Sequence, residues 1–159
     1  MGRLRSAGVR PRGGCRLKSR NGNQFKSFPA LAENLPAELR ARSAILDGEI
    51  VCLDRHGKTQ FKDLLFRSGE PRFYTFDLLW ADGEDLRDLP LTDRKLRLRS
   101  LVPGDHGERL LYCDHIEGDG EGLFRLVCEH DIEGIVDKWK PGLYLPQKPS
   151  SWVKIRNRG

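Results

Sequence analysis

Two apolar segments constrain the fold most, because both have the composition of β-strands that end in turns. AILDGEIVCLD (44–54) is rich in β-branched residues and partly alternating, and the turn-forming run 55–58 follows it. FYTFDLLW (73–80) is rich in aromatic residues and precedes Asp82-Gly83, a hairpin-turn dipeptide. We therefore predict two strands that pair with their neighbours in antiparallel fashion.

Helical and further strand patterns surround these two segments. The expected elements are helices over 31–39, 93–101 and 122–130, and strands over 109–116, 131–139 and 151–156. Thr92 is the expected N-cap of the second helix, with Leu96 in the core and Pro103 ending it. Leu123, Leu126 and Val127 are expected to face inward from the third helix. Strands outnumber helices, so the predicted fold class is α+β, with antiparallel β-sheets flanked by helices.

Basic residues gather at the two ends of the chain. Residues 1–20 hold seven Arg or Lys and no acid, and residues 138–159 hold six and no acid. The net charge is only +5, so the middle of the chain is acidic. This distribution favours a polyanionic partner near the ends, although basic tails that only aid solubility would produce the same pattern. We expect residues 1–14 to be an irregular basic segment.

Composition narrows the class of protein. Apolar residues make up 38% of the 159 residues, which suits one folded soluble domain, and no apolar run is long enough to cross a bilayer. The four cysteines show no Cys-x-x-Cys pairing, so we expect them to be free and buried. Free thiols indicate a reducing compartment, and we expect a cytoplasmic protein without membrane contact.

Charged residues interrupt the apolar strands, where a charge is costly unless it has a partner. Glu49 is predicted to share a strand face with Ile45 and Val51, so it should meet a cation, a metal ion or a sugar hydroxyl. A salt-bridged glutamate on an edge strand is the alternative. Glu133 similarly shares a face with Ile135 and precedes Gly134, a residue type that often marks close approach by a ligand or another backbone.

Cations interrupt two further segments. In SWVKIR (151–156), the two-residue period places Trp152, Lys154 and Arg156 on one side of a strand. Two cations on one face suit a phosphate, and an exposed edge protected by charge is the alternative. Arg20 stands beside an Asn-Gly turn.

Five of these segments, in this order, resemble the nucleotidyltransferase core of ATP-dependent DNA ligases, most closely the short bacterial forms. The matching stretches are SRNG (19–22) with motif Ia, LDGEIV (46–51) with the conserved acidic strand, FYTFDLLW (73–80) with motif III, EGIVDKWK (133–140) with motif IV, and SWVKIR (151–156) with motif V. The resemblance implies an ATP-grasp-like fold, with residues 15–159 forming part of an adenylation domain. It implies nick sealing through lysyl-AMP and DNA-adenylate, in DNA repair and recombination, with nicked double-stranded DNA and ATP as partners.

The resemblance also implies roles for individual residues. They are Arg20 on the ribose or a phosphate, Glu49 on the ribose hydroxyl or a metal ion, Phe76 stacked on adenine, Glu133 on Mg²⁺ or Mn²⁺, Lys154 on the α-phosphate, and Lys138 and Arg156 as further nucleotide contacts. Glu49, Glu133 and Lys154 are thus the expected catalytic residues. A core position explains Phe76 equally well, and we expect Asp77 to be a hydrogen-bond acceptor at a strand end.

Four features depart from the family pattern. Asp137 stands where motif IV usually has a small residue, and should add negative charge beside the metal site or face solvent. Arg156 replaces a common lysine in motif V. The sequence contains no Lys-x-Asp-Gly, the motif of the nucleophilic lysine, and it ends just past motif V, where an OB-fold usually follows. We therefore expect these 159 residues to form no lysyl-AMP. A catalytically inactive nucleotide- or DNA-binding remnant, and an RNA ligase or capping-type nucleotidyltransferase, remain alternatives.

Overall fold

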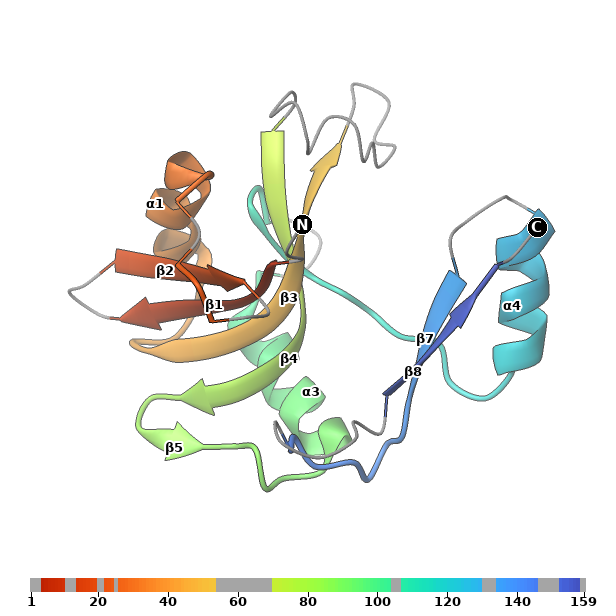
Figure 1. Ribbon diagram of the computed structural model, residues 1–159. Coiled ribbons are helices and arrows are strands. Elements are labelled where there is room, and N and C mark those ends of the chain that lie inside the picture. The colour runs from red at the N-terminus through yellow and green to blue at the C-terminus, as the bar shows by residue number, and fades with distance from the viewer. Residues whose placement is uncertain are drawn as a thin grey trace.

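The computed structural model describes most of the chain and places its elements around one large sheet (Figure 1). The described residues are 4–10, 14–19, 22–24, 26–53, 70–103, 107–129, 134–145 and 152–157.

The large sheet has six strands in the order β2-β1-β3-β4-β5, with β6 beside β4. Their bounds are β1 Leu4–Arg10, β2 Gly14–Ser19, β3 Ala44–Leu53, β4 Glu70–Ala81, β5 Glu84–Asp85 and β6 Leu110–Tyr112. All pairs are antiparallel except β4 with β6, which run parallel. A second sheet contains β7 (Gly134–Lys138) and β8 (Trp152–Arg156), which form an antiparallel pair. The predicted α+β class with antiparallel sheets is confirmed.

Strand β1 corrects the expectation that residues 1–14 are irregular. Residues 4–10 pair with β2 on one side and with β3 on the other. Backbone hydrogen bonds to two neighbours stabilise an extended conformation here, although glycine and arginine give this segment no clear strand pattern. Gly14–Ser19 is the second strand of this hairpin.

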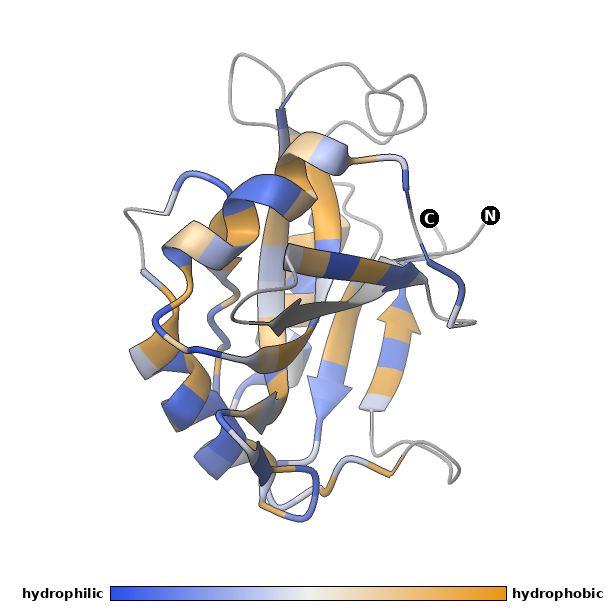
Figure 2. Cartoon of the chain, turned by 90° about the vertical axis from the view of Figure 1, so that its left-hand side faces the viewer, coloured by the Kyte–Doolittle hydropathy of each residue, from blue (hydrophilic) through white to orange (hydrophobic). Residues whose placement is uncertain are grey.

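Three helices complete the fold: α1 (Pro29–Glu38), α3 (Leu91–Leu101) and α4 (Gly120–Glu129). Figure 2 shows α1 and α3 on one face of the large sheet. Their buried leucines form a common core with apolar residues of β3 and β4, and its members include Leu31, Leu35, Leu98, Leu46, Ile50, Phe73 and Leu78. Helix α4 lies on the far side of the β7–β8 hairpin from the large sheet (Figure 1).

The β4–β5 hairpin turns where the Asp-Gly dipeptide predicted. Ala81 pairs with Glu84, so Asp82 and Gly83 are the two turn residues. Both have positive φ, at 47° and 100°, which a two-residue hairpin turn of type I′ requires at its two central residues. Asp82 also accepts a hydrogen bond from the Ser43 amide through Oδ1, at 2.8 Å.

Helix α3 differs from its prediction in the face that it buries. The helix starts at Leu91, and no side-chain hydrogen bond caps it, so Thr92 is not an N-cap. Leu96 is 72% exposed, because the helical period places Leu91, Leu98 and Arg94 on the buried side instead. An ion pair to the sheet accounts for an arginine at a core position.

Three smaller expectations were also wrong. Leu126 of α4 is 53% exposed, whereas Val127 is buried as expected. The strand expected over 109–116 is limited to β6, although the Cys113 amide still donates a hydrogen bond to the Thr75 carbonyl oxygen of β4. All four cysteines are free, but only Cys52 is buried and Cys128 is exposed. None of the described helices has the length and apolar character needed to cross a membrane.

Candidate nucleotide site

The floor of the candidate site is the middle of the β3–β4 pair. Asp47, Gly48 and Glu49 lie there beside a register shift between Asp47 and Gly48. A Cβ atom at Gly48 would lie 2.4 Å from the Tyr74 carbonyl oxygen, so only glycine allows β4 to approach this closely. Glu49 is exposed and lies between buried Gly48 and Ile50, so it shares the outer face of β3 with Ile45 and Val51, as predicted. Asp47 of the same strand is only 1% exposed.

Asp77 anchors this floor to helix α3. Its carboxylate accepts two hydrogen bonds from Arg94, with Nε 2.8 Å from Oδ1 and Nη2 2.9 Å from Oδ2, and both side chains are buried. Asp77 is thus a hydrogen-bond acceptor as expected, but it lies within β4 and not at its end. Arg94 Nη1 also donates to the carbonyl oxygens of Leu89 and Gly142, at 2.6 and 3.1 Å. One guanidinium therefore ties the sheet to the loop that follows β7.

The β7–β8 hairpin forms the opposite wall. Lys138 pairs with Trp152, and Val136 pairs with Lys154, so these four side chains share one face of the hairpin. Trp152 and Lys154 are half-buried there, as the period of two predicted for one face of β8. The other face carries Val153, which is 57% exposed.

Asp137 lies on that other face. It pairs with Val153 and is exposed to solvent, so its charge points away from Lys138 and Lys154. Of the two expectations for this departure from motif IV, the solvent-facing one is supported.

Aromatic rings of β4 and of the β7–β8 hairpin contact each other across the site. The Phe76 and Trp152 ring centroids are 5.7 Å apart, with planes at 75°. Tyr144 contacts Trp152 edge-on at 6.3 Å, and its hydroxyl donates a 3.3 Å hydrogen bond to Asp47 Oδ2. Lys138 lies within this group, with Nζ 4.0 Å from the Phe76 centroid and 3.7 Å from the Trp152 centroid. We call Phe76, Lys138, Tyr144 and Trp152 the aromatic cluster.

Burial lowers the pKa of Lys138, the lysine in this cluster. Loss of hydration lowers the pKa of Lys138 to about 8, and the positive charge of Lys95 acts in the same direction. The carboxylates of Asp77 and Asp47 oppose this shift. The ring faces of Phe76 and Trp152 provide further electrostatic stabilisation of the ammonium at neutral pH.

The structure brings some of the predicted site residues together. Phe76 and Lys138 are in contact, and Lys154 shares their side of the hairpin. Glu49 and Arg156 are exposed. Arg20 and Glu133 lie outside the described residues. Tyr144 and Trp152 were not among the predicted site residues. An isolated tyrosine in a loop carries no pattern, whereas the alternation of Trp152 with Lys154 was an available signal.

Metal ligation is not complete within the described residues. Across the ranges that the structure describes, no three His, Cys, Asp or Glu side chains converge as a metal site would require. Glu49 offers an accessible carboxylate, and Glu133 lies outside the described ranges.

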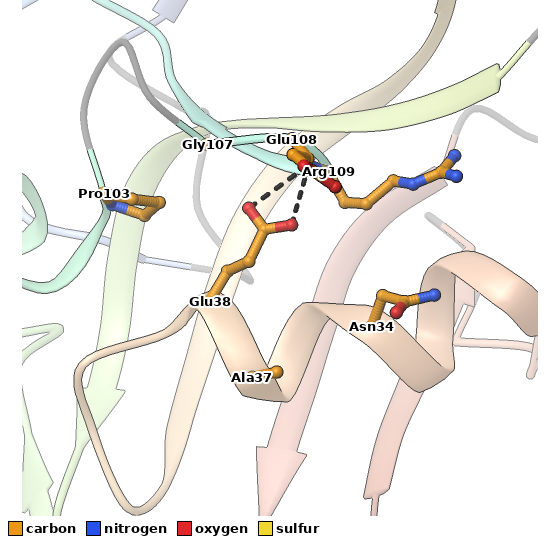
Figure 3. A pocket seen from close by; sticks show the side chains of 7 residues that line it. All are labelled: Asn34, Ala37, Glu38, Pro103, Gly107, Glu108 and Arg109. Carbon is orange, nitrogen blue, oxygen red and sulfur yellow. Dashed lines mark hydrogen bonds between the residues drawn. The ribbon is translucent and has the colours of Figure 1, made fainter.

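A surface pocket lies elsewhere, between α1 and the segment that leads into β6 (Figure 3). Its lining includes Asn34, Glu38, Pro103 and Arg109. The Glu38 carboxylate accepts hydrogen bonds from the backbone amides of Arg109 and Leu110, at 2.9 and 3.0 Å. Because these oxygens already bind backbone, we interpret Glu38 as a structural link.

Comparisons with known proteins place this geometry in context. A family model described as ATP dependent DNA ligase domain matches residues 5–156. The multifunctional non-homologous end joining protein LigD of Pseudomonas aeruginosa is 31% identical over 149 residues, which cover 91% of this chain and 18% of that protein. LigD of Mycolicibacterium smegmatis is 34% identical over 149 residues, covering 89% of this chain and 19% of that protein.

Solved structures agree with these sequence matches. The ligase domain of M. tuberculosis LigD superposes with a TM-score of 0.75 at 31% identity, over 98% of this chain and 51% of that chain. A mycobacterial DNA ligase D complexed with ATP and MES gives 0.76 at 29% identity, with the same coverage. The chain thus spans about half the length of these solved chains and about a fifth of the curated relatives. Since the family model covers nearly all of this sequence, the chain belongs to the family of ATP-dependent DNA ligase domains.

Proposed function

We propose that this chain provides the nucleotide-binding part of an ATP-dependent DNA ligase that seals nicks in DNA repair and recombination. The observation that carries the proposal is the convergence of Phe76 from β4 with Lys138, Trp152 and Lys154 from the β7–β8 hairpin. An aromatic ring for a base and cations for phosphates are the two groups that a nucleotide site requires.

ATP is the proposed nucleotide. Phe76 would stack on adenine, while Lys154 and Arg156 would neutralise phosphate charge, with Lys154 on the α-phosphate. Arg20 is proposed to hold the ribose or a phosphate. The mycobacterial DNA ligase D that superposes on this chain was solved with ATP, which supports this choice.

A divalent cation, Mg²⁺ or Mn²⁺, is the proposed companion of ATP, with Glu49 and Glu133 as its oxygen ligands. Carboxylate oxygens are the ligands that these hard ions prefer, and Glu49 is accessible. When bound, such an ion neutralises negative charge on the phosphates. The described residues supply only part of its ligand set.

Nicked double-stranded DNA is the proposed substrate. Exposed Arg16 and Lys18 lie on β2 at the edge of the large sheet, and Arg156 is exposed on β8. Basic side chains of this kind bind DNA phosphates, so affinity should fall steeply as salt rises. The four free cysteines agree with a reducing compartment, and we propose the cytoplasm.

Sealing of a pre-adenylated nick tests the proposal. In that step the 3′-hydroxyl oxygen forms a bond to the 5′-phosphorus, the bond from that phosphorus to the bridging oxygen of AMP breaks, and the hydroxyl proton passes to solvent, so no lysine nucleophile is needed. Phe76 would orient the adenine, and Lys154 would stabilise the charge on the departing AMP phosphate.

We expect the 159-residue chain to seal this substrate and release AMP. Lys154→Ala should reduce the rate at least about 100-fold, by analogy with the loss of one transition-state donor. Lys140→Ala, which removes an exposed lysine paired with Glu117, is the matched control and should retain the rate. Absence of sealing by the unmodified chain would contradict ligase activity and favour an inactive remnant. A parallel incubation with labelled ATP and Mg²⁺ should leave the chain without a covalent AMP.

A further inference from the structure

The face of Phe76 that turns toward the hairpin is already occupied by a side chain of the protein. Lys138 Nζ lies 4.0 Å from the Phe76 centroid and 3.7 Å from the Trp152 centroid, which are cation–π distances to both rings. The Trp152 ring also meets Phe76 at 5.7 Å and 75°. Lys138 and Trp152 are a registered pair of β7 and β8, so one hairpin position delivers both groups to Phe76.

A nucleobase cannot share this face with the ammonium. Stacked aromatic rings need their own van der Waals space, with ring centroids about 4.5–7 Å apart. Lys138 Nζ stands within that space. A base can therefore stack on this face of Phe76 only if it displaces the Lys138 ammonium, which then loses its two cation–π contacts.

Ligands differ in what they offer the displaced ammonium. A nucleotide brings phosphate oxygens, which bind a lysine by charge-assisted hydrogen bonds. Lys154 lies on the same hairpin face, where it pairs with Val136, so the phosphates of a bound nucleotide are expected within reach of that face. A nucleoside or free base brings no anion. It must displace the cation without replacing the lost interaction.

We propose that Lys138 is a specificity-determining residue, whose ammonium occupies the base-stacking face of Phe76 and thereby favours phosphorylated nucleotides over nucleosides. This inference rests on the proposed nucleotide-binding function. In this role Lys138 does more than contact the nucleotide. Its side chain moves from the two aromatic rings to a phosphate when a nucleotide binds, and a nucleoside offers no such phosphate.

Binding of ATP and of adenosine to the 159-residue chain tests this role. NMR titrations that follow the Trp152 indole N–H measure both affinities, including weak ones. Lys138→Met keeps a long apolar side chain and removes the charge. We expect adenosine to bind this variant about tenfold more tightly than the unmodified chain, as the loss of two competing cation–π contacts predicts. ATP should gain nothing or bind more weakly, so the preference for ATP over adenosine should fall at least tenfold.

Two matched variants distinguish a selective role of Lys138 from a general loss of structure at the site. Lys138→Arg keeps a cation that can lie on aromatic rings and should keep the preference. Lys140→Met removes a lysine two residues away, whose ammonium binds Glu117, and should change neither affinity. Equal changes in both ligands with Lys138→Met, or no gain for adenosine, would overturn the inference while leaving nucleotide binding intact. Failure of the unmodified chain to bind ATP would overturn the nucleotide site itself and this inference with it.

Discussion

The guanidinium of Arg94 lies against the carboxylate of Asp77, with Nε 2.8 Å from Oδ1 and Nη2 2.9 Å from Oδ2. Neither side chain is exposed to water. The same guanidinium binds the carbonyl oxygen of Gly142, two residues before Tyr144. The pair therefore connects the core of the protein to the aromatic cluster.

Removing one partner of this pair should be strongly destabilising. Arg94→Met leaves the Asp77 carboxylate buried without its cation, and we expect a loss of about 3–5 kcal/mol in the free energy of unfolding. Urea denaturation measures this loss. Arg97→Met on the same helix is the control, because its pair with Glu84 is exposed, and it should leave the free energy of unfolding nearly unchanged. Similar costs for the two variants would contradict the assigned role of the buried pair.

Glu38 should link α1 to the segment entering β6. Glu38 is the last residue of α1, where a carboxylate interacts unfavourably with the helix dipole. The hydrogen bonds that it accepts from the Arg109 and Leu110 backbone amides compensate for this placement (Figure 3). We expect Glu38→Ala to lower the free energy of unfolding by about 1–3 kcal/mol, because the amides of Arg109 and Leu110 lose their acceptor.

Hydrogen exchange gives a local measurement of the same change. The Arg109 and Leu110 amides should exchange faster in Glu38→Ala, whereas Glu33→Ala, an exposed position on α1, should leave them unchanged. Unaltered exchange at both amides in Glu38→Ala would show that the link is not formed in solution.

The half-buried Lys138 should make stability depend on alkaline pH. Its pKa falls from an ordinary 10.5 to about 8 in the folded protein, so the unfolded chain binds more protons between these values. The contribution of Lys138 to the free energy of unfolding therefore rises with pH from about 8 to 10.5, by about 3 kcal/mol.

Comparison with Lys138→Met isolates this contribution. Urea unfolding of both proteins from pH 7 to 10.5 gives the difference at each pH, and subtraction removes other alkaline groups, including Cys15, whose pKa burial raises to about 11. Asp77, Asp47, Lys95 and Cys113 are the charged or titratable neighbours of Lys138, and all are present in both proteins. The free energy of unfolding of the unmodified chain should increase, relative to that of Lys138→Met, as the pH rises. A difference independent of pH would contradict burial of this ammonium.

Local patterns in the sequence predicted the elements that a single segment can indicate. β-branched and aromatic runs indicated strands β3 and β4, and the Asp82-Gly83 dipeptide indicated the turn after β4, because these signals lie within one segment of the sequence. The resemblance likewise selected Phe76, Lys138 and Lys154, which lie on facing elements.

Long-range pairing explains what the sequence did not reveal. Arg94 occupies a core position only because Asp77 lies opposite, 17 residues earlier in the chain. Strand β1 forms because two neighbours bind its backbone, and Tyr144 joins the aromatic cluster through Asp47, 97 residues away. Charge and periodicity along one segment contain no information about such partners.

Isothermal titration of ATP into the unmodified chain and into Phe76→Ala tests the central claim most directly. Loss of one base–aromatic stack costs about 1–3 kcal/mol. We therefore predict saturable ATP binding to the unmodified chain and roughly 10- to 100-fold weaker binding to Phe76→Ala. Phe124→Ala, on helix α4, should bind ATP as the unmodified chain does. Equal ATP affinity of the unmodified chain and Phe76→Ala, or no ATP binding by the unmodified chain, would contradict a nucleotide site built on Phe76.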